Sequence, residues 1–296
     1  MRWHGVFPAI TTPFDATLTV DEAALGAHVE WLLASGCAGI VPLGSLGEGN
    51  TLSFAEKLRV LDVSREALAG RVPLVPGIAA LSTAEAVALV REAERRGCAG
   101  AMVLPPYVYR GDARETLAHF GAVLEATKLP CMLYNNPIAY GTDVTPEQIA
   151  DLAARHANLS AVKESSADIR RFTALRTLLG DRLALFAGVD DLIVEAIDAG
   201  ASGWIAGLVN AFPSESVRLF ALCERDERAA AWQLYAWFLP LLRLDTIPKF
   251  VQAIKLVQAE VGRGSERVRP PRLALQGEER TRVLEIVRES VLTRTP

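Results

Sequence analysis

Residues 158–166 have the sequence Asn158-Leu159-Ser160-Ala161-Val162-Lys163-Glu164-Ser165-Ser166. The apolar centre of this segment lies between polar, turn-forming residues, which is typical of a short buried strand. The pattern places Lys163 at the carboxyl end of that strand. An ammonium group loses hydration there, so its neutral amine becomes available as a nucleophile. A strand-end lysine paired with a neighbouring carboxylate is the alternative, because buried lysines are often structural.

The chain has five lysines, and the other four lie in ordinary contexts. Lys57 belongs to a charged helix face, and Lys128 precedes a proline-containing connection. Lys249 and Lys255 fall in a helical region near the C-terminus. Only Lys163 lies in an apolar strand pattern, which makes it the candidate catalytic residue.

Short apolar runs alternate with helical patterns along the first 223 residues. Strands are expected at 5–14, 39–44, 72–78, 100–104, 130–134, the segment carrying Lys163, 183–187 and 204–208. Helices are expected at 21–34, 53–69, 82–96, 112–126, from 145 onward, 169–179, 192–199 and from 213 onward. Continuous apolar runs suit strands that are buried on both faces of a parallel sheet.

Eight such strand–helix units predict a closed (β/α)8 TIM barrel. An open, doubly wound sheet is the alternative, but it needs a glycine fingerprint after the first strand. Thr11-Thr12-Pro13-Phe14 is not one. After residue 223 the alternation stops, and helices are expected at 227–242, 248–261 and 278–292. We therefore expect a barrel at residues 1–223 and a C-terminal helical extension at 224–296 packed on it.

Composition excludes several classes of function. The net charge of −4 and the absence of a basic run argue against nucleic-acid binding. The N-terminus lacks the apolar region of a signal peptide, and no apolar stretch is long enough to span a bilayer. Cys37, Cys98, Cys131 and Cys223 form no Cys-x-x-Cys pair. They predict reduced thiols in a cytoplasmic protein, without disulfides or zinc.

In a barrel the site lies at the carboxyl ends of the strands. No histidine lies at any expected strand end, and Asp190 with Asp191 is a weak metal signal, so we expect no metal. No nucleotide or flavin fingerprint is present, so we expect no cofactor. The loops after the last two strands are acidic or neutral, which argues against a phosphorylated substrate.

The candidates that remain for the site are Lys163, Tyr134 and the glycine-rich loop 44–49. A lysine amine attacks a ketone to form a protonated imine, which is an electron sink. A tyrosine hydroxyl can transfer protons during that reaction. Free backbone N–H groups in a glycine-rich loop can hold a carboxylate. The loop as an ordinary turn, and Tyr134 as a barrel-filling aromatic, are the alternatives.

Five motifs in this order resemble a known family, the class I Schiff-base aldolases and lyases that include dihydrodipicolinate synthase and N-acetylneuraminate lyase. The motifs are Gly44-Ser45-Leu46-Gly47-Glu48, Leu133-Tyr134-Asn135-Asn136-Pro137, Val162-Lys163-Glu164-Ser165-Ser166, Gly188-Val189-Asp190-Asp191 and Ile247-Pro248-Lys249. The resemblance extends from residue 5 to about residue 255 and implies a TIM barrel. It also implies a small 2-oxo or imino acid as substrate, and a homo-oligomer, either a dimer or a tetramer.

The resemblance implies roles for particular residues. Lys163 forms the imine, Tyr134 relays protons, and Ser45 hydrogen-bonds Tyr134. The remaining implied substrate-binding residues are Leu46, Gly47, Tyr107, Tyr109, Gly188 and Ile205. The backbone around Ser45 and Leu46 holds the substrate carboxylate, and the carbonyl of Ile205 lies beside the bound keto acid.

Three positions depart from the synthases of this family. Leu46 replaces a second hydroxyl residue of the loop. Val108, between Tyr107 and Tyr109, lies where synthases have a tyrosine that crosses the dimer interface. Ala139 lies where synthases have an arginine for the second substrate's carboxylate. Condensation of pyruvate with aspartate semialdehyde is therefore the less favoured activity, because a buried carboxylate needs a cationic partner.

Segments 134–137 and 165–172 instead resemble the subgroup that acts on sugar-acid or hydroxyproline breakdown intermediates. The activity implied first is deamination with dehydration of 4-hydroxy-1-pyrroline-2-carboxylate to 2-oxoglutarate semialdehyde. Three alternatives stay open. They are a dehydratase or aldolase for a 2-keto-3-deoxy sugar acid, 4-hydroxy-tetrahydrodipicolinate synthase, and a non-catalytic barrel that binds a keto acid.

Overall fold

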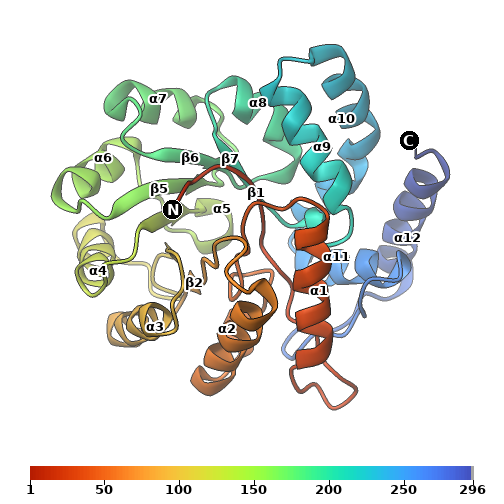
Figure 1. Ribbon diagram of the computed structural model, residues 1–296, viewed down its shortest axis with the longest axis horizontal. Coiled ribbons are helices and arrows are strands. Elements are labelled where there is room, and N and C mark those ends of the chain that lie inside the picture. Colours follow the sequence, from red (N-terminus) through yellow and green to blue (C-terminus); the bar gives the residue numbers. More distant parts are fainter. Residues whose placement is uncertain (295–296) are drawn as a thin grey trace.

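The computed structural model describes residues 1–294 and has a curled parallel sheet inside a ring of helices (Figure 1). The strands are β1 (Gly5–Pro8), β2 (Gly77–Ile78), β3 (Ala101–Val103), β4 (Cys131–Asn135), β5 (Leu159–Glu164), β6 (Ala184–Ala187) and β7 (Gly203–Ala206). They pair in the order β1-β7-β6-β5-β4-β3-β2, and every pairing is parallel. All carboxyl ends therefore meet at one end of a TIM-barrel-like sheet.

Helices follow the strands and cover the outside of the sheet (Figure 1). They are α1 (Glu22–Ala34), α2 (Phe54–Leu68), α3 (Thr83–Arg95), α4 (Ala113–Glu125), α5 (Pro137–Tyr140), α6 (Pro146–Arg155), α7 (Arg170–Leu179), α8 (Ile193–Asp198) and α9 (Pro213–Glu224). Capping residues explain several starts, because their side chains accept hydrogen bonds from the first turn. Asp21 caps α1 and Thr145 caps α6, whereas α5 was not expected from the sequence.

The expected strand at 39–44 is not a strand, so the described residues contain seven strands where the sequence predicts eight. Isolated parallel bridges join Val41 to Ala9 and Ile40 to Leu74. Pro42 has no N–H group to donate, and Leu43 has a φ of 65°, which a strand does not accommodate. The segment is still hydrogen-bonded on both sides, because the N–H group of Val41 donates to the carbonyl of Pro8 and that of Ile40 to Pro73.

Three more helices follow α9, as the sequence predicts. They are α10 (Arg228–Leu242), α11 (Phe250–Glu260) and α12 (Gly277–Leu292). Helix α10 packs on α9, and α12 packs on α10 and α11 (Figure 1). The short 3-10 helix η4 (Arg243–Asp245) joins α10 to the segment before α11. One buried hydrophobic cluster extends from β1 to α12. The domain boundary at residue 223 stays a prediction.

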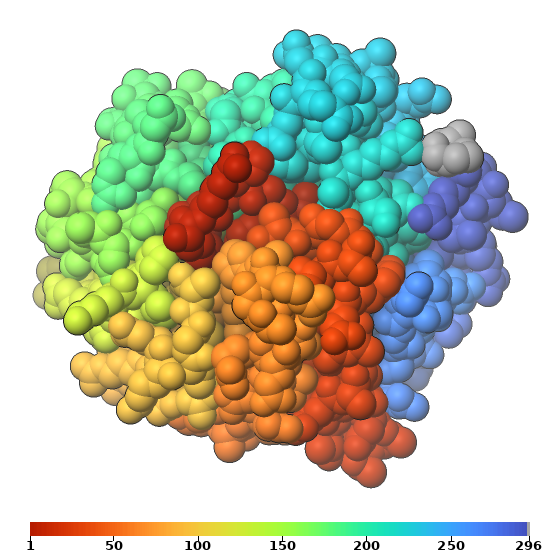
Figure 2. Space-filling model, viewed as in Figure 1, coloured from red at the N-terminus to blue at the C-terminus, as the bar shows by residue number. Residues whose placement is uncertain are grey.

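One end of the ring is closed by the N-terminal segment. The indole of Trp3 packs against the rings of Phe7 and Phe186, with centroids 6.4 and 6.1 Å apart. Figure 2 shows the N-terminal residues crossing the middle of this face. A substrate must therefore enter from the other end, where the strands finish. Within residues 1–294, no helix has the length and apolar character that crossing a membrane requires.

Candidate active site

A cavity of about 400 Å³ opens where the strands end, which is a size typical of small-molecule sites. Strands β4 and β5, the loops after β6 and β7, and segment 245–250 all contribute to its wall. Six residues that the sequence predicts for the site line this cavity: Ser45, Leu46, Tyr134, Lys163, Gly188 and Ile205. The fold thus brings together side chains that are up to 160 positions apart in the sequence, counted from Ser45 to Ile205 (205 − 45).

Lys163 and Tyr134 are direct neighbours on adjacent parallel strands. The Nζ atom of Lys163 lies 4.1 Å from the centre of the Tyr134 ring. Both side chains are almost fully buried, with 6% and 5% of their surface exposed. The amine therefore lies against an aromatic face at the wall of the cavity and not in bulk water.

Burial alone does not distinguish Lys163, because Lys57 and Lys255 are also buried. Lys57 pairs with Glu85 at 3.1 Å, and Lys255 pairs with Glu48 at 2.5 Å. Within residues 1–294, Lys163 has no carboxylate within 4.0 Å and donates no hydrogen bond. The missing partner, and not burial, makes this amine free to react.

Gly188 leaves the space that the lysine side chain occupies. A Cβ atom at position 188 would lie 2.6 Å from Cε of Lys163 and 2.0 Å from Oγ of Ser165. Real Cβ atoms do not approach other atoms so closely, so any side chain at 188 would displace Lys163. The hydroxyl of Ser165 is buried at the cavity wall and has no hydrogen-bond partner among the described residues.

The expected hydrogen bond between Ser45 and Tyr134 is not present. Ser45 instead hydrogen-bonds the hydroxyl of Tyr140, whose ring packs edge-on against Tyr134 with centroids 5.7 Å apart. The hydroxyl of Tyr134 accepts a hydrogen bond from Nδ2 of Asn136 at 2.9 Å. The sequence prediction did not include α5, whose turn brings Tyr140 back to the strand end. Burial raises the pKa of the Tyr140 phenol well above its ordinary value, so Tyr140 stays protonated.

Loop 44–50 is fixed by a buried ion pair. Glu48 has a φ of 52° and pairs with Lys255, while its other oxygen accepts from the backbone N–H group of Arg269 at 2.9 Å. The backbone N–H groups of Ser45, Leu46 and Gly47 donate no hydrogen bond within residues 1–294. The free N–H groups of Ser45 and Leu46, the two of these residues that line the cavity, can hold a carboxylate.

Three predicted site residues do not line the cavity. Gly47 packs on backbone, because a Cβ atom there would lie 2.8 Å from the carbonyl of Ile10. Tyr107 lines an adjoining cavity with Ser45 and Tyr140. The Tyr109 side chain is exposed, and its hydroxyl donates to Glu115 at 3.1 Å.

Several cavity residues were missed in the sequence, among them Asn136, Asp245 and Phe250. Asn136 belongs to motif 133–137, and its position two residues after Tyr134 is the sequence feature that could have identified it as a site residue. Asp245 comes from the helical region that the sequence assigns to packing. Asp190 does not face the cavity, because its carboxylate accepts from the N–H groups of Gly207 and Leu208 and from the indole of Trp204.

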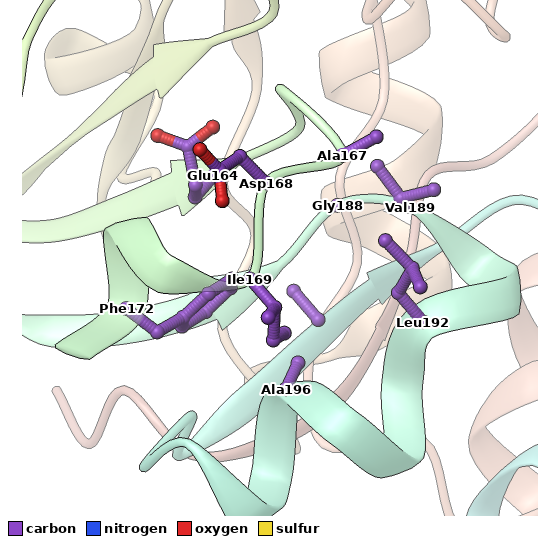
Figure 3. Close-up of a pocket in the computed structure, with 10 residues that line it drawn as sticks. Glu164, Ala167, Asp168, Ile169, Phe172, Gly188, Val189, Leu192 and Ala196 are labelled. Carbon is purple, nitrogen blue, oxygen red and sulfur yellow. The ribbon is translucent and has the colours of Figure 1, made fainter.

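A second, much smaller cavity of about 10 Å³ lies behind the strand ends, between the loops after β5 and β6 (Figure 3). Figure 3 shows the apolar side chains of Ile169, Leu192 and Ala196 gathered around it. Its volume admits at most one water molecule. The substrate site is therefore the 400 Å³ cavity and not this void.

No group of three or more histidine, cysteine, aspartate or glutamate side chains within residues 1–294 is arranged to hold a metal ion. The four cysteines are free, and three of them are buried. Burial raises the pKa of Cys37, Cys98 and Cys131 to about 12. These thiols are therefore protonated at neutral pH and are poor nucleophiles.

The chain is similar to known proteins along nearly all of its length. The model of the dihydrodipicolinate synthetase family matches residues 2–290. A 4-hydroxy-tetrahydrodipicolinate synthase from Agrobacterium fabrum is 33% identical over 269 residues, which cover 91% of this chain and 92% of that protein. A protein of the same name from Acidobacterium capsulatum is 32% identical over 298 residues, covering 100% and 99%.

Solved structures give the same result. The 4-hydroxy-tetrahydrodipicolinate synthase from Methylacidiphilum fumariolicum superimposes with a TM-score of 0.93 at 28% identity and covers 98% of each chain. The dihydrodipicolinate synthase from Aquifex aeolicus gives a TM-score of 0.94 at 26% identity, covering 99% of this chain and 100% of that one. The fold is thus shared with these enzymes over nearly the whole chain.

Proposed function

Because the chain belongs to the dihydrodipicolinate synthetase family of lyase and aldolase-type enzymes, we propose that Lys163 forms an imine with a small 2-oxo acid or cyclic imino acid. The observation that carries this proposal is the buried amine of Lys163, which lacks a carboxylate partner and lies 4.1 Å from the ring centre of Tyr134. A lysine amine that is not held by a carboxylate can attack a carbonyl or imine carbon at the wall of such a cavity.

The substrate that we favour is 4-hydroxy-1-pyrroline-2-carboxylate. Lys163 adds to its C2 carbon, and the Tyr134 phenol protonates the departing ring nitrogen, which opens the ring. The resulting phenolate, stabilised by the hydrogen bond from Asn136, removes a proton from C3 to give an enamine. Loss of the C4 hydroxyl leaves a C3–C4 double bond, which proton shifts from C5 convert into an imine between C5 and the freed nitrogen. Hydrolysis of this imine and of the Lys163 imine then yields ammonia and 2-oxoglutarate semialdehyde, for a net uptake of one water.

The free N–H groups of loop 44–47 support this assignment, because they can hold the single carboxylate of the substrate. Ala139 lines the cavity, so its wall there carries a methyl group. A cation is absent from the position where the synthases of this family bind a second carboxylate. The same imine and proton-transfer steps would serve a 2-keto-3-deoxy sugar acid, which also has one carboxylate.

4-Hydroxy-tetrahydrodipicolinate synthase is the second candidate, because the relatives at 32–33% identity carry that name. Three assays separate the candidates. The first measures ammonia released from the hydroxypyrroline acid, and the second measures dehydration of a 2-keto-3-deoxy sugar acid. The third measures condensation of pyruvate with aspartate semialdehyde. We expect ammonia release to be fastest, whereas faster condensation would contradict our assignment of Ala139.

The proposal also covers the closure of the barrel, the need for a metal or cofactor, and the oligomeric state. We infer that segment 39–44 takes the place of the eighth strand, supported by its bridges on both sides, so that the barrel is closed. We propose that the imine supplies the electron sink without a metal or cofactor. We also propose a homo-oligomer, dimeric or tetrameric, because the exposed apolar side chains of Val108, Tyr109 and Ile138 lie close to the cavity.

A further inference from the structure

Asp245 is a carboxyl group in the cavity wall to which the mechanism above gives no role. It is the last residue of η4 and lines the 400 Å³ cavity, to which its side chain is partly exposed. Its Oδ1 atom is buried and has no hydrogen-bond partner within residues 1–294. Buried polar atoms in native proteins are almost always paired. The substrate is the partner that the structure leaves room for.

Asp245 reaches the cavity beside Gly207, whereas Tyr134 reaches it from β4. A Cβ atom at Gly207, just after β7, would lie 2.0 Å from Oδ1 and 2.6 Å from Oδ2 of Asp245. Tyr134 belongs to β4, and β5 with Lys163 lies between β4 and the β6–β7 pair. The absence of a side chain at 207 is what allows the carboxyl group to occupy this place. A substrate on Lys163 therefore shares the cavity with a phenol from β4 and with a carboxyl group beside the end of β7.

The charges around Asp245 favour its protonated form. Burial raises the pKa of Asp245 well above its ordinary value, and the negative charge of Asp190 raises it further. Lys163 opposes this shift, and Asp191 adds to it. No arginine or lysine lies within 4.0 Å of the Asp245 carboxyl group in the described chain. A buried acid without a cationic partner can donate a proton at neutral pH.

We propose that Asp245, as a neutral carboxylic acid, donates a proton to the hydroxyl group that leaves the enamine formed on Lys163. The C4–O bond breaks, its electron pair goes to oxygen, and the Asp245 proton completes a water molecule. The enamine electrons form the new C3–C4 double bond, and the carboxylate of Asp245 regains a proton from solvent. This inference rests on the proposed function, because it needs an imine at Lys163 and a hydroxyl leaving group.

The inference also separates dehydration from condensation within one cavity. Imine formation and removal of the C3 proton need Lys163 and Tyr134 but no acid on the β7 side. Only expulsion of the hydroxyl group needs an acid on that side. Asp245 therefore acts as a specificity-determining proton donor for substrates that lose water.

The test compares Asp245→Asn with the wild-type protein. We expect the kcat for ammonia release from 4-hydroxy-1-pyrroline-2-carboxylate to fall by about 10²–10⁴-fold, the range of general acid catalysis. Borohydride trapping of pyruvate at Lys163 and exchange of the pyruvate methyl protons with deuterium should both stay near the wild-type level. Asp181→Asn is the matched control, because Asp181 does not line the cavity and its exposed side chain pairs with Arg176; its kcat should not change.

A leaving-group experiment distinguishes proton donation from a structural role. Fluoride departs without a proton, so the 4-fluoro analogue of the substrate should react with Asp245→Asn nearly as fast as with wild type. Unchanged turnover of the hydroxy substrate, or no rescue by fluoride, overturns the role of Asp245 and leaves the proposed function standing. Loss of pyruvate trapping in both Asp245→Asn and Asp245→Glu would show a structural role and overturns it too. If borohydride traps no pyruvate in the wild-type protein, both the role of Asp245 and the proposed function are contradicted.

Discussion

Lys163 and Tyr134 occupy paired positions on β5 and β4, and the amine of Lys163 lies 4.1 Å from the centre of the Tyr134 ring. Parallel pairing holds two such side chains on the same side of the sheet at a fixed spacing. The amine has an aromatic neighbour but no carboxylate within the described chain. This combination distinguishes Lys163 from the two other buried lysines.

Replacing Tyr134 by Phe should remove the proton relay while keeping the ring that packs against Lys163. We expect the rate of turnover to fall by about 10²–10⁴-fold, with little change in thermal stability. The measurement is steady-state kinetics with the best substrate of the three assays. Tyr109→Phe is the matched control, since this phenol is exposed and its hydroxyl hydrogen-bonds Glu115 outside the cavity. Equal losses in both variants would contradict the assignment of Tyr134.

Replacing Gly188 by Ala should disable the site through steric overlap. The new Cβ atom would lie 2.6 Å from Cε of Lys163, so the lysine side chain must move. We expect a destabilisation of about 1–3 kcal/mol and loss of borohydride labelling with pyruvate. Gly121→Ala in α4 is the control, because its new Cβ atom would meet nothing closer than 3.5 Å. That variant should keep full labelling and be as stable as wild type or slightly more so.

Replacing Lys255 by Met should destabilise the protein strongly, because it leaves the carboxylate of Glu48 buried without its cation. Breaking one partner of a buried ion pair costs about 3–5 kcal/mol, measured by urea unfolding. The exposed pair of Lys249 with Glu279 provides the control, and Lys249→Met should cost less than about 1 kcal/mol. Similar losses for the two variants would show that the Glu48 pair does not anchor loop 44–50.

The burial of Lys255, which its pairing with Glu48 offsets only in part, predicts a dependence of stability on pH. Burial lowers the pKa of Lys255 from 10.5 to about 8, so the folded protein releases this proton at a lower pH than the unfolded chain. Between about pH 8 and 10.5 the unfolded state binds more protons, and the free energy of unfolding therefore rises with pH. Urea unfolding across this range should show the rise in wild type and not in Lys255→Met. A rise of equal size in both would assign it to other groups.

Much of the fold could be predicted, because its signals are local. Apolar runs, capping residues such as Asp21 and Thr145, and the placement of Lys163 at a strand end are all visible in the sequence. The second strand was not predicted correctly. Pro42 and the positive φ of Leu43 interrupt its ladder. The proline is visible in the sequence and argues against a regular strand, whereas nothing in the apolar pattern indicates the φ of Leu43.

The site was only partly predictable, because its contacts depend on distant segments. Six predicted residues line the cavity. Ser45, however, hydrogen-bonds Tyr140 and not Tyr134, because α5, which the sequence analysis did not predict, brings Tyr140 to the strand end. Lys255 was assigned to ordinary helix packing, although it anchors loop 44–50 through Glu48. The sequence analysis did not identify Asp245 as a site residue, because no local sequence pattern indicates that η4 reaches the cavity.

The most direct test of the central claim is covalent trapping. The protein is reduced with borohydride in the presence of pyruvate, digested, and analysed by mass spectrometry. We predict one adduct, on the peptide that contains Lys163, and none in Lys163→Ala. An adduct on Lys57 or Lys255, or no adduct with pyruvate or the hydroxypyrroline acid, would contradict the account.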